Sequence, residues 1–566
     1  MRKSKSKSRK SSSAKSGTNS QAGAELSRKE QKALQRKAAR EKKEFIQSLS
    51  TSFGISIFLG ALLAIAVDPK IGVAMIVGIP CMMLSNKYPR QGIWAFLIYM
   101  PFGGTVTYWL AGGNSLSILA KDAFFIPALL SFVKDCQRKR LPILVPKGLV
   151  MPMGLLLAMA TITLLSVNLL EMQLGGGSGQ PFLQGILGLK VLVGYVPLIF
   201  CAYYLIRNKK DLVFVGRLHV VLAIICCVLG LLQYYKLDSG SCQGTRGLVG
   251  DALFKATLDA KCLVGGSVVF SPEVDMVRLP GTFPSPWHWA WFLISNAALT
   301  FTTAFNDPVP LWRIGGLAGM GLVFINAVIS GQRIALMLVP VVIGILLVLT
   351  GQIANLKRFL PIGVGLGFAL VIAAIQNPAI VQERWDSTVS RWQAAPPQQF
   401  IEHQFEWAIS KTEGDFFGDG LGVATNSTRA FGDVHLVETF HPKLLVEMGF
   451  PGLIAFLIVM TALTVITFMS YRKVQDRVLR SYGSSFWVFI LIISYWPYWY
   501  PLDTDPVAVY YWFFAGVILK LPAIDKEESR LRAEQEATEN NSASNGKTGK
   551  RKGKKKKKRR LQEVGA

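Results

Sequence analysis

Long apolar runs recur along most of this chain, and they constrain its fold more than any other feature. Of the 566 residues, 51% are hydrophobic and 17% are charged. A helix needs about 20 apolar residues to cross the hydrocarbon core of a bilayer, and many of the runs approach that length. They lack the alternation of polar and apolar residues that membrane-barrel strands require. The sequence therefore predicts an all-α protein, a polytopic transmembrane helical bundle.

About fourteen spans are predicted from the lengths of these runs. Their approximate ranges are 52–67, 71–86, 92–111, 116–133, 149–170, 183–206, 211–235, 286–304, 311–329, 334–350, 358–376, 443–469, 484–498 and 506–521. An even number returns the C-terminus to the side of the N-terminus. We expect a transmembrane domain at 46–521, a basic and partly disordered cytoplasmic N-tail at 1–45, and a basic disordered cytoplasmic C-tail at 522–566.

The basic residues of the short connections fit this arrangement. Lys and Arg are absent from the short loops at 171–182 and 501–505, on the predicted outer side. They occur in the predicted cytoplasmic connections, as Lys87, Arg90, Lys134, Arg138, Lys139, Arg140, Arg207, Lys209, Lys210, Arg313, Lys357, Arg358, Arg472, Lys473, Arg477 and Arg480. Cytoplasmic loops of membrane proteins carry such an excess of positive charge. The pattern predicts that both termini lie in the cytoplasm.

The two tails carry most of the formal net charge of +27. By count they supply about two-thirds of it. A basic segment next to a membrane span is typical of cytoplasmic retention and of contact with anionic lipids. Binding of nucleic acid is the alternative interpretation, and we do not expect it.

Two long polar loops, at 236–285 and 377–442, fall on the outer side, with the second predicted to be largely helical. Since the outside is an oxidising compartment, Cys242 and Cys262 are expected to form a disulfide, with two free thiols as the alternative. Loops as long as the second are usually functional. Its composition predicts helices at 383–392 and 398–411, separated by two prolines.

Two arginines stand at predicted span ends on this outer side. Arg278 opens the sequence Arg-Leu-Pro-Gly-Thr-Phe-Pro-Ser-Pro, in which Gly281 and the prolines predict a fixed turn. Arg333 ends the turn Ser-Gly-Gln-Arg, where Gly331 leaves room for a ligand. Because guanidinium groups present several fixed donors and keep their charge, the pair predicts a site for an anionic lipid headgroup. Arginines that only extend to the headgroup region, or pair with acids, are the alternative.

Further candidates lie in the second outer loop and at its end. Gly420 and Gly422 belong to a Gly-x-Gly-x-Gly turn. The segment from Glu438 to Gly452 enters the span at 443–469 and includes His441, Glu447 and Gly449. Glu438 and His441 are candidate general bases, and each is equally suited to pairing with an arginine. For Glu447 we favour the structural role.

In order along the chain, these motifs resemble the O-antigen ligase and O-antigen polymerase superfamily. The motifs are R-x-x-G-T-F-x-x-P, S-G-x-R, a Gly-x-Gly-x-Gly turn and E-x-G-x-x-G, within about residues 270–470. The resemblance implies an integral membrane glycosyltransferase of the GT-C type in a bacterial inner membrane. The family often has His-Asn eleven residues before the glycine equivalent to Gly449, where this chain has Glu438-Thr439.

This resemblance implies transfer of a glycan from a polyprenyl-diphosphate carrier to an acceptor hydroxyl, on a glycan or a lipid, during assembly of surface polysaccharide such as lipopolysaccharide. Arg278 and Arg333 would then bind the diphosphate, and Glu438 or His441 would act as base. We expect no cofactor and no metal, because no set of carboxylates spaced as metal ligands accompanies the arginines. Asp415, Asp419 and Asp433 are the residues that would contradict this expectation.

Two other functions remain possible from the sequence. A small-anion transporter, for example of bicarbonate, is proposed for some relatives of this superfamily. Transporters usually show repeated halves and helices broken at mid-membrane, and neither is visible here. A scaffold that acts through its basic tails leaves the outer loops without a role.

Overall fold

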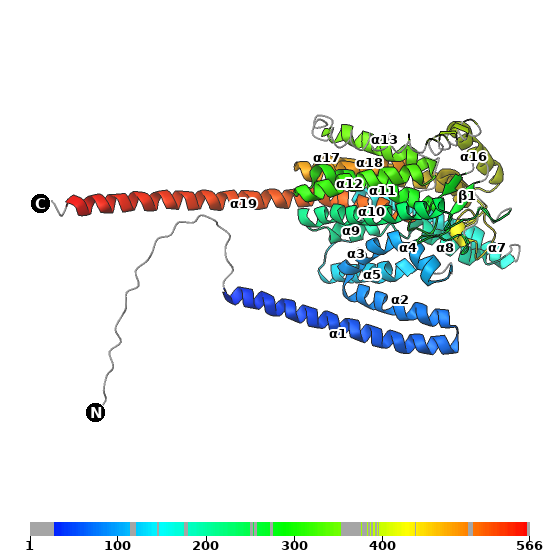
Figure 1. The fold of residues 1–566 in the computed structure, drawn as a ribbon, viewed down its shortest axis with the longest axis horizontal. Helices are drawn as coiled ribbons and strands as arrows, with labels where there is room; N and C mark the ends of the chain where they lie inside the picture. Colours follow the sequence, from blue (N-terminus) through cyan, green and yellow to red (C-terminus); the bar gives the residue numbers. More distant parts are fainter. Residues whose placement is uncertain are drawn as a thin grey trace, which may run out of the picture.

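The computed structural model describes residues 28–562 except 114–119, 144–145, 175–178, 250–252, 254–256, 272–275, most of 353–395, 436 and 496–501. Helices make up nearly all of the described chain (Figure 1). They are α1 (Arg28–Ala66), α2 (Pro69–Lys87), α3 (Pro89–Tyr99), α4 (Gly103–Thr105), α5 (Asp122–Arg138), α6 (Lys147–Thr163), α7 (Leu169–Leu174), α8 (Pro181–Val193), α9 (Leu198–Leu205), α10 (Lys209–Asp238), α11 (Pro286–Asn306), α12 (Pro310–Ile329), α13 (Arg333–Leu349), α16 (Pro397–Lys411), α17 (Phe440–Arg472), α18 (Arg477–Tyr495) and α19 (Val507–Gln562).

Nine helices within the described residues are long and apolar enough to cross a membrane. The protein is therefore an all-α helical membrane protein, as its apolar runs predict. The number of fourteen spans and the cytoplasmic position of both termini stay predictions. The expected span at 358–376 and the expected helix at 383–392 lie mostly outside the described residues. The expected helix at 398–411 is confirmed as α16.

Proline sets the beginning of several helices. It occupies the first helical position of α3, α8, α11 and α12. Its ring fixes φ near the helical value, and the N–H that it lacks has no acceptor in a first turn. The apolar runs therefore begin as helices at the positions that their prolines mark.

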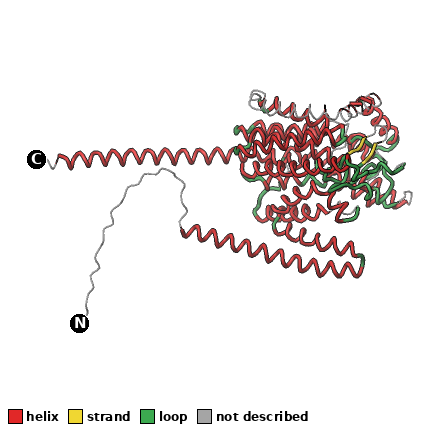
Figure 2. Tube along the Cα trace, in the orientation of Figure 1, coloured by secondary structure: helices red, strands yellow, loops and turns green. Residues whose placement is uncertain are grey.

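The two ends of the bundle differ in structure. One end, which we call the loop end, carries the connections at 239–285 and 396–439, and loops gather there (Figure 2). It also carries an antiparallel pair of strands, β1 (Val269–Ser271) and β2 (Met276–Arg278), in which Val269 lies opposite Arg278. From the opposite end, which we call the tail end, α19 extends away from the bundle (Figure 1).

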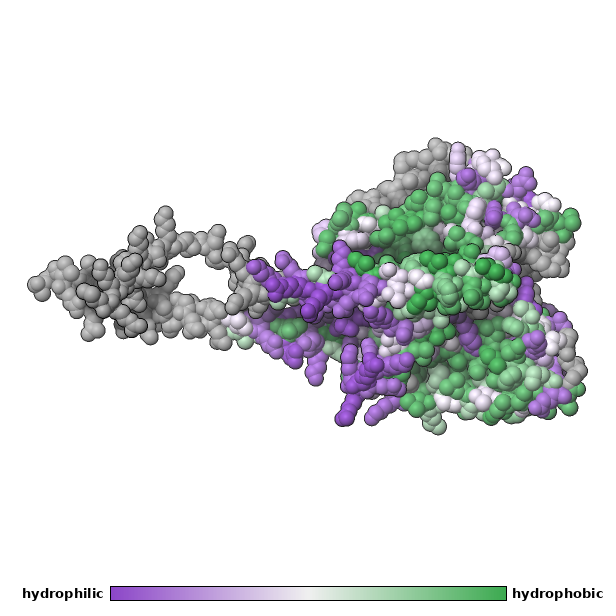
Figure 3. Space-filling view, turned by 90° about the horizontal axis from the view of Figure 1, so that it is seen from below, coloured by the Kyte–Doolittle hydropathy of each residue, from purple (hydrophilic) through white to green (hydrophobic). Residues whose placement is uncertain are grey.

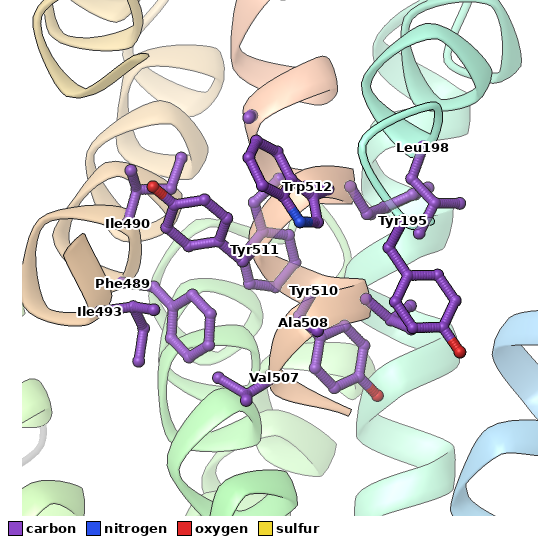
Figure 4. Packing of buried hydrophobic residues seen from close by; sticks show 14 of the residues in the cluster. Tyr195, Leu198, Phe489, Ile490, Ile493, Val507, Ala508, Tyr510, Tyr511 and Trp512 are labelled. Carbon is purple, nitrogen blue, oxygen red and sulfur yellow. The ribbon is translucent and has the colours of Figure 1, made fainter. Parts of the chain in front are cut away.

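Aromatic side chains fill the centre of the bundle. The rings of Phe486 in α18 and Phe514 in α19 stack with centroids 4.2 Å apart. Tyr510, Tyr511 and Trp512 of α19 pack among side chains of α9 and α18, including Leu198 and Phe489 (Figure 4). Hydrophobic residues also cover much of the bundle's outer flank (Figure 3), as contact with lipid requires.

At the tail end, Asp476, in the connection between α17 and α18, binds side chains of α10 and α19. Its carboxylate accepts hydrogen bonds from Lys209 of α10 at 2.9 Å and from Arg532 of α19 at 2.6 Å. Burial raises its pKa, but these hydrogen bonds outweigh that effect and lower the pKa to about 2. Arg532 lies in the predicted C-tail, which forms the later part of α19. The pair Arg530–Glu534, four residues apart, favours helix in this segment.

Candidate functional site

The structure brings the segment of Arg278 into contact with the turn that leads to Arg333. The Leu279 N–H donates to the Ser330 carbonyl at 3.0 Å. Gly331 has φ +69°, and a Cβ added to it would lie 2.4 Å from the Val277 carbonyl oxygen and 3.3 Å from Arg278 Cα. Both arginines are half-buried. The two motifs are therefore parts of one surface at the loop end, although 55 positions separate Arg278 from Arg333.

The turn after Arg278 is held by a side chain from the end of α10. The Gln233 carboxamide accepts from the Gly281 N–H at 3.0 Å and donates to the Cys262 carbonyl at 2.9 Å. Gly281 has φ +56° and lies so close to Trp289 that a Cβ would be 2.4 Å from the indole. Cys262 is joined to Cys242 by a disulfide, with 5.8 Å between the Cα atoms, which confirms the predicted pairing. A helix, a disulfide and a glycine thus fix the backbone beside Arg278.

The Gly-x-Gly-x-Gly turn packs against Asn168, between α6 and α7, and against Gln184 of α8. The Asn168 carboxamide accepts from the Leu421 N–H at 2.9 Å and donates to the Leu421 carbonyl at 3.1 Å. Gly420 and Gly422 have φ +111° and +87°, and a Cβ on Gly422 would lie 2.4 Å from the Gln184 carbonyl oxygen. These glycines therefore shape a buried contact between loop and bundle.

The start of α17 is interrupted where it meets the same turn. Gly449 has φ +65°, and a Cβ there would lie 2.1 Å from the Phe416 carbonyl oxygen. Two residues earlier, the buried Glu447 carboxylate accepts from the Ala424 N–H at 3.1 Å and from the Thr425 hydroxyl at 2.7 Å. Glu447 thus has structural partners, but they are a backbone N–H and a hydroxyl rather than the arginine that the sequence analysis considered.

The two predicted bases lie in different surroundings. Glu438 is exposed, and its backbone N–H donates to Gln404 of α16 at 3.1 Å. His441 is buried in the first turn of α17, with its ring edge toward Phe456 at a centroid distance of 6.2 Å. Their catalytic roles stay predictions.

Among the described residues of the second loop, the acidic side chains do not form a cluster of metal ligands. Asp419 lies 4.0 Å from Lys411, and burial raises the pKa of Asp419 although the lysine opposes that effect. Across the part of the chain that the structure describes, no three His, Cys, Asp or Glu side chains are arranged to hold a metal ion. The prediction of a metal-independent reaction stays untested.

Sequence reasoning missed a second polar cluster at the loop end. Lys121, the residue before α5, hydrogen-bonds to the Asp505 carboxylate in the connection before α19. Burial raises the pKa of Asp505, but Lys121 and His288 outweigh that effect and bring the pKa below its usual value. These three residues line a cavity whose wall includes Phe283, in the turn that follows Arg278.

A signal for this cluster was present in the sequence. Lys121 and Asp122 interrupt an apolar run that we predicted as a span, and ionisable residues within spans usually have a function. The partner of Lys121, however, lies 384 positions away. Composition alone does not reveal such a pairing.

Comparison with known proteins adds no family to this description. No protein-family model matches the chain, and no curated protein is significantly similar to it.

Proposed function

We propose that this protein is a membrane glycosyltransferase that moves a glycan from a polyprenyl-diphosphate carrier to an acceptor hydroxyl, like the O-antigen ligases and polymerases. The observation that supports it is the contact between the Arg278 segment and the Ser330–Arg333 turn. We further propose that the membrane is the bacterial cytoplasmic membrane and that the loop end faces outward.

In this reaction the acceptor oxygen forms a bond to the anomeric carbon of the glycan while the bond from that carbon to the diphosphate oxygen breaks. Negative charge grows on the leaving diphosphate, where Arg278 and Arg333 would stabilise it by charge-assisted hydrogen bonds. The hydroxyl proton passes to a base. Of the two candidates, Glu438 is the exposed one and can release that proton to water.

The test is the surface-glycan profile of cells that lack the protein and are supplied with variants of it. Arg278→Ala and Arg333→Ala are expected to reduce transfer at least ~100-fold, as loss of a transition-state donor does elsewhere. Arg429→Ala is the matched control, because Arg429 is an exposed arginine of the loop end whose guanidinium donates to the nearby Asn426 carbonyl at 3.1 Å.

A normal glycan profile in both arginine variants, at unchanged protein abundance, would contradict the proposal. Normal-length glycan left on its carrier indicates a ligase, and shortened chains indicate a polymerase. An unchanged profile with altered uptake of small anions favours a transporter.

A further inference from the structure

At the tail end, the first turns of α3 and α10 lie together. Arg90 of α3 donates to the Asp211 carboxylate of α10 at 3.1 Å and to the Leu205 carbonyl at 2.7 Å. One turn further into the bundle, the rings of Trp94 in α3 and Phe214 in α10 meet edge to face, with their centroids 5.0 Å apart. The two helices therefore share one surface, which runs from a charged edge to an aromatic pair.

The apolar part of this surface continues along α10 as an exposed stripe. Large apolar residues recur on it at spacings of three, four or seven and are between 39% and 48% exposed: Phe214, Val221, Ile225, Val228 and Leu232. Such spacings place them on one face of the helix. Lys210 comes four residues before Phe214, so it stands on the same face, at the tail end of the stripe. A contiguous exposed apolar face of this kind is suited to lipid acyl chains.

Positive charge exceeds negative charge at the charged edge. Arg207 and Lys210 are exposed, and in the described part of the chain neither side chain forms an ion pair. Asp211 already pairs with Arg90, and its carboxylate also accepts from the Arg207 backbone N–H at 3.0 Å. Arg90, Arg207 and Lys210 thus bring three positive charges against the one negative charge of Asp211.

This excess of positive charge acts on Arg207. Burial lowers the pKa of its guanidinium, and the neighbouring Arg90 lowers it further, although Asp211 opposes both effects. Both α3 and α10 begin at this edge, and the N-terminus of a helix carries partial positive charge. A negatively charged group placed here would therefore be stabilised, whereas a cation would be repelled.

A phosphate diester that carries acyl chains matches both parts of the surface. Guanidinium and ammonium groups donate charge-assisted hydrogen bonds to phosphate oxygens. The acyl chains would lie along the exposed apolar stripe that begins beside these groups. Basic sites between membrane helices bind anionic lipid headgroups in this manner. A free phosphate ion would use the basic residues but not the stripe.

From these observations we infer that Arg90, Arg207 and Lys210 bind the phosphate of an anionic phospholipid whose acyl chains lie along Trp94 and Phe214. The site lies at the end of the bundle opposite the proposed glycan-transfer surface, so the inference does not rest on the proposed function. It also differs from contact of the basic tails with lipid, because all of these residues belong to the bundle.

The test uses the full-length protein in nanodiscs of phosphatidylcholine. These contain a small fraction of either photoactivatable phosphatidylglycerol or photoactivatable phosphatidylcholine with the same acyl chains. Peptides cross-linked to lipid are quantified by mass spectrometry. We expect phosphatidylglycerol to label the segments 90–94 and 207–214 about tenfold or more above phosphatidylcholine, which corresponds to ~1.4 kcal/mol in binding free energy.

The double variant Arg207→Gln with Lys210→Gln should remove this preference, because it takes away the two positive charges that have no acid of their own. Both side chains are exposed, and the Arg90–Asp211 pair stays in place, so this variant is expected to fold. Arg472→Gln with Lys473→Gln is the matched control. It removes the same two charges from exposed positions of the tail end, at the end of α17.

Three results would overturn the inference. The two lipids could label the segments equally, the first double variant could keep the preference, or both double variants could lose it to the same extent. The last result would mean that general surface charge is responsible. Excess inorganic phosphate should leave labelling unchanged relative to sodium chloride of equal ionic strength. Displacement of the lipid by phosphate would show that the site takes the free ion instead.

Discussion

Buried Glu447 shows how one residue can be assigned a role by its contacts. Its carboxylate accepts from the Ala424 N–H and the Thr425 hydroxyl, which belong to the second loop. Removing the acceptor leaves two buried donors unsatisfied. This destabilises the folded protein more than replacing both donor and acceptor by apolar groups would. Glu447 therefore fastens the loop to α17.

Glu447→Ala should lower the free energy of unfolding by about 2–4 kcal/mol, because two buried donors lose their partner. Glu447→Gln keeps one acceptor oxygen and should have a smaller effect. The measurement is thermal unfolding in detergent, with Glu438→Ala as an exposed control that leaves the midpoint unchanged. If Glu447→Ala abolished transfer without any loss of stability, a structural role would be excluded.

At the scale of elements, the turn at 330–333 depends on a glycine conformation. Gly331 combines positive φ with close approach to the backbone of β2. The sequence predicts a tight turn in which Gly331 leaves room for a ligand, whereas in the structure Gly331 packs against the strand that carries Arg278. The Ser-Gly-Gln-Arg motif of this turn was recognisable from its residues. Strand β2 and its contact with the turn were not, because a strand of three residues leaves no periodic signal in the sequence.

Gly331→Ala should separate the two arginine segments. The new Cβ would meet the Val277 carbonyl oxygen at 2.4 Å, and a positive φ disfavours any residue with a Cβ. We expect transfer in the cell assay to fall at least about tenfold, equivalent to ~1.4 kcal/mol. Gly344→Ala, in the open interior of α13, should leave transfer unchanged. Equal activity of the two variants would show that this contact does not position the site.

At the scale of the whole molecule, apolar periodicity and proline positions predict most of the helices, because each signal is local. The second cluster and the C-terminal helix illustrate what local signals miss. Lys121 meets Asp505 only when the connections before α5 and before α19 come together, and Arg532 meets Asp476 only when α19 continues beyond the bundle. Contacts of this kind depend on tertiary structure, so the local sequence does not reveal them.

Both tails lie at one end of the bundle and the polar loops lie at the other. This arrangement leads to a test of how the protein is oriented in the membrane. If the loop end faces outward, a cysteine replacing Arg429 should react with a membrane-impermeant maleimide in intact cells. A cysteine replacing Lys473 at the tail end should react only after the membrane is opened. Both positions are exposed in the structure. Cys136, Cys201, Cys226 and Cys227 are buried, so a Cys81→Ser background removes the remaining accessible free thiol.

The reverse labelling pattern would place the arginine surface on the cytoplasmic side, where lipid-linked glycans are assembled rather than transferred outward. Labelling of both positions in intact cells would mean that the predicted spans do not separate the two ends. Either result removes the physical basis of the proposed reaction, because the diphosphate donor and the paired arginine segments must meet on the same face of the membrane.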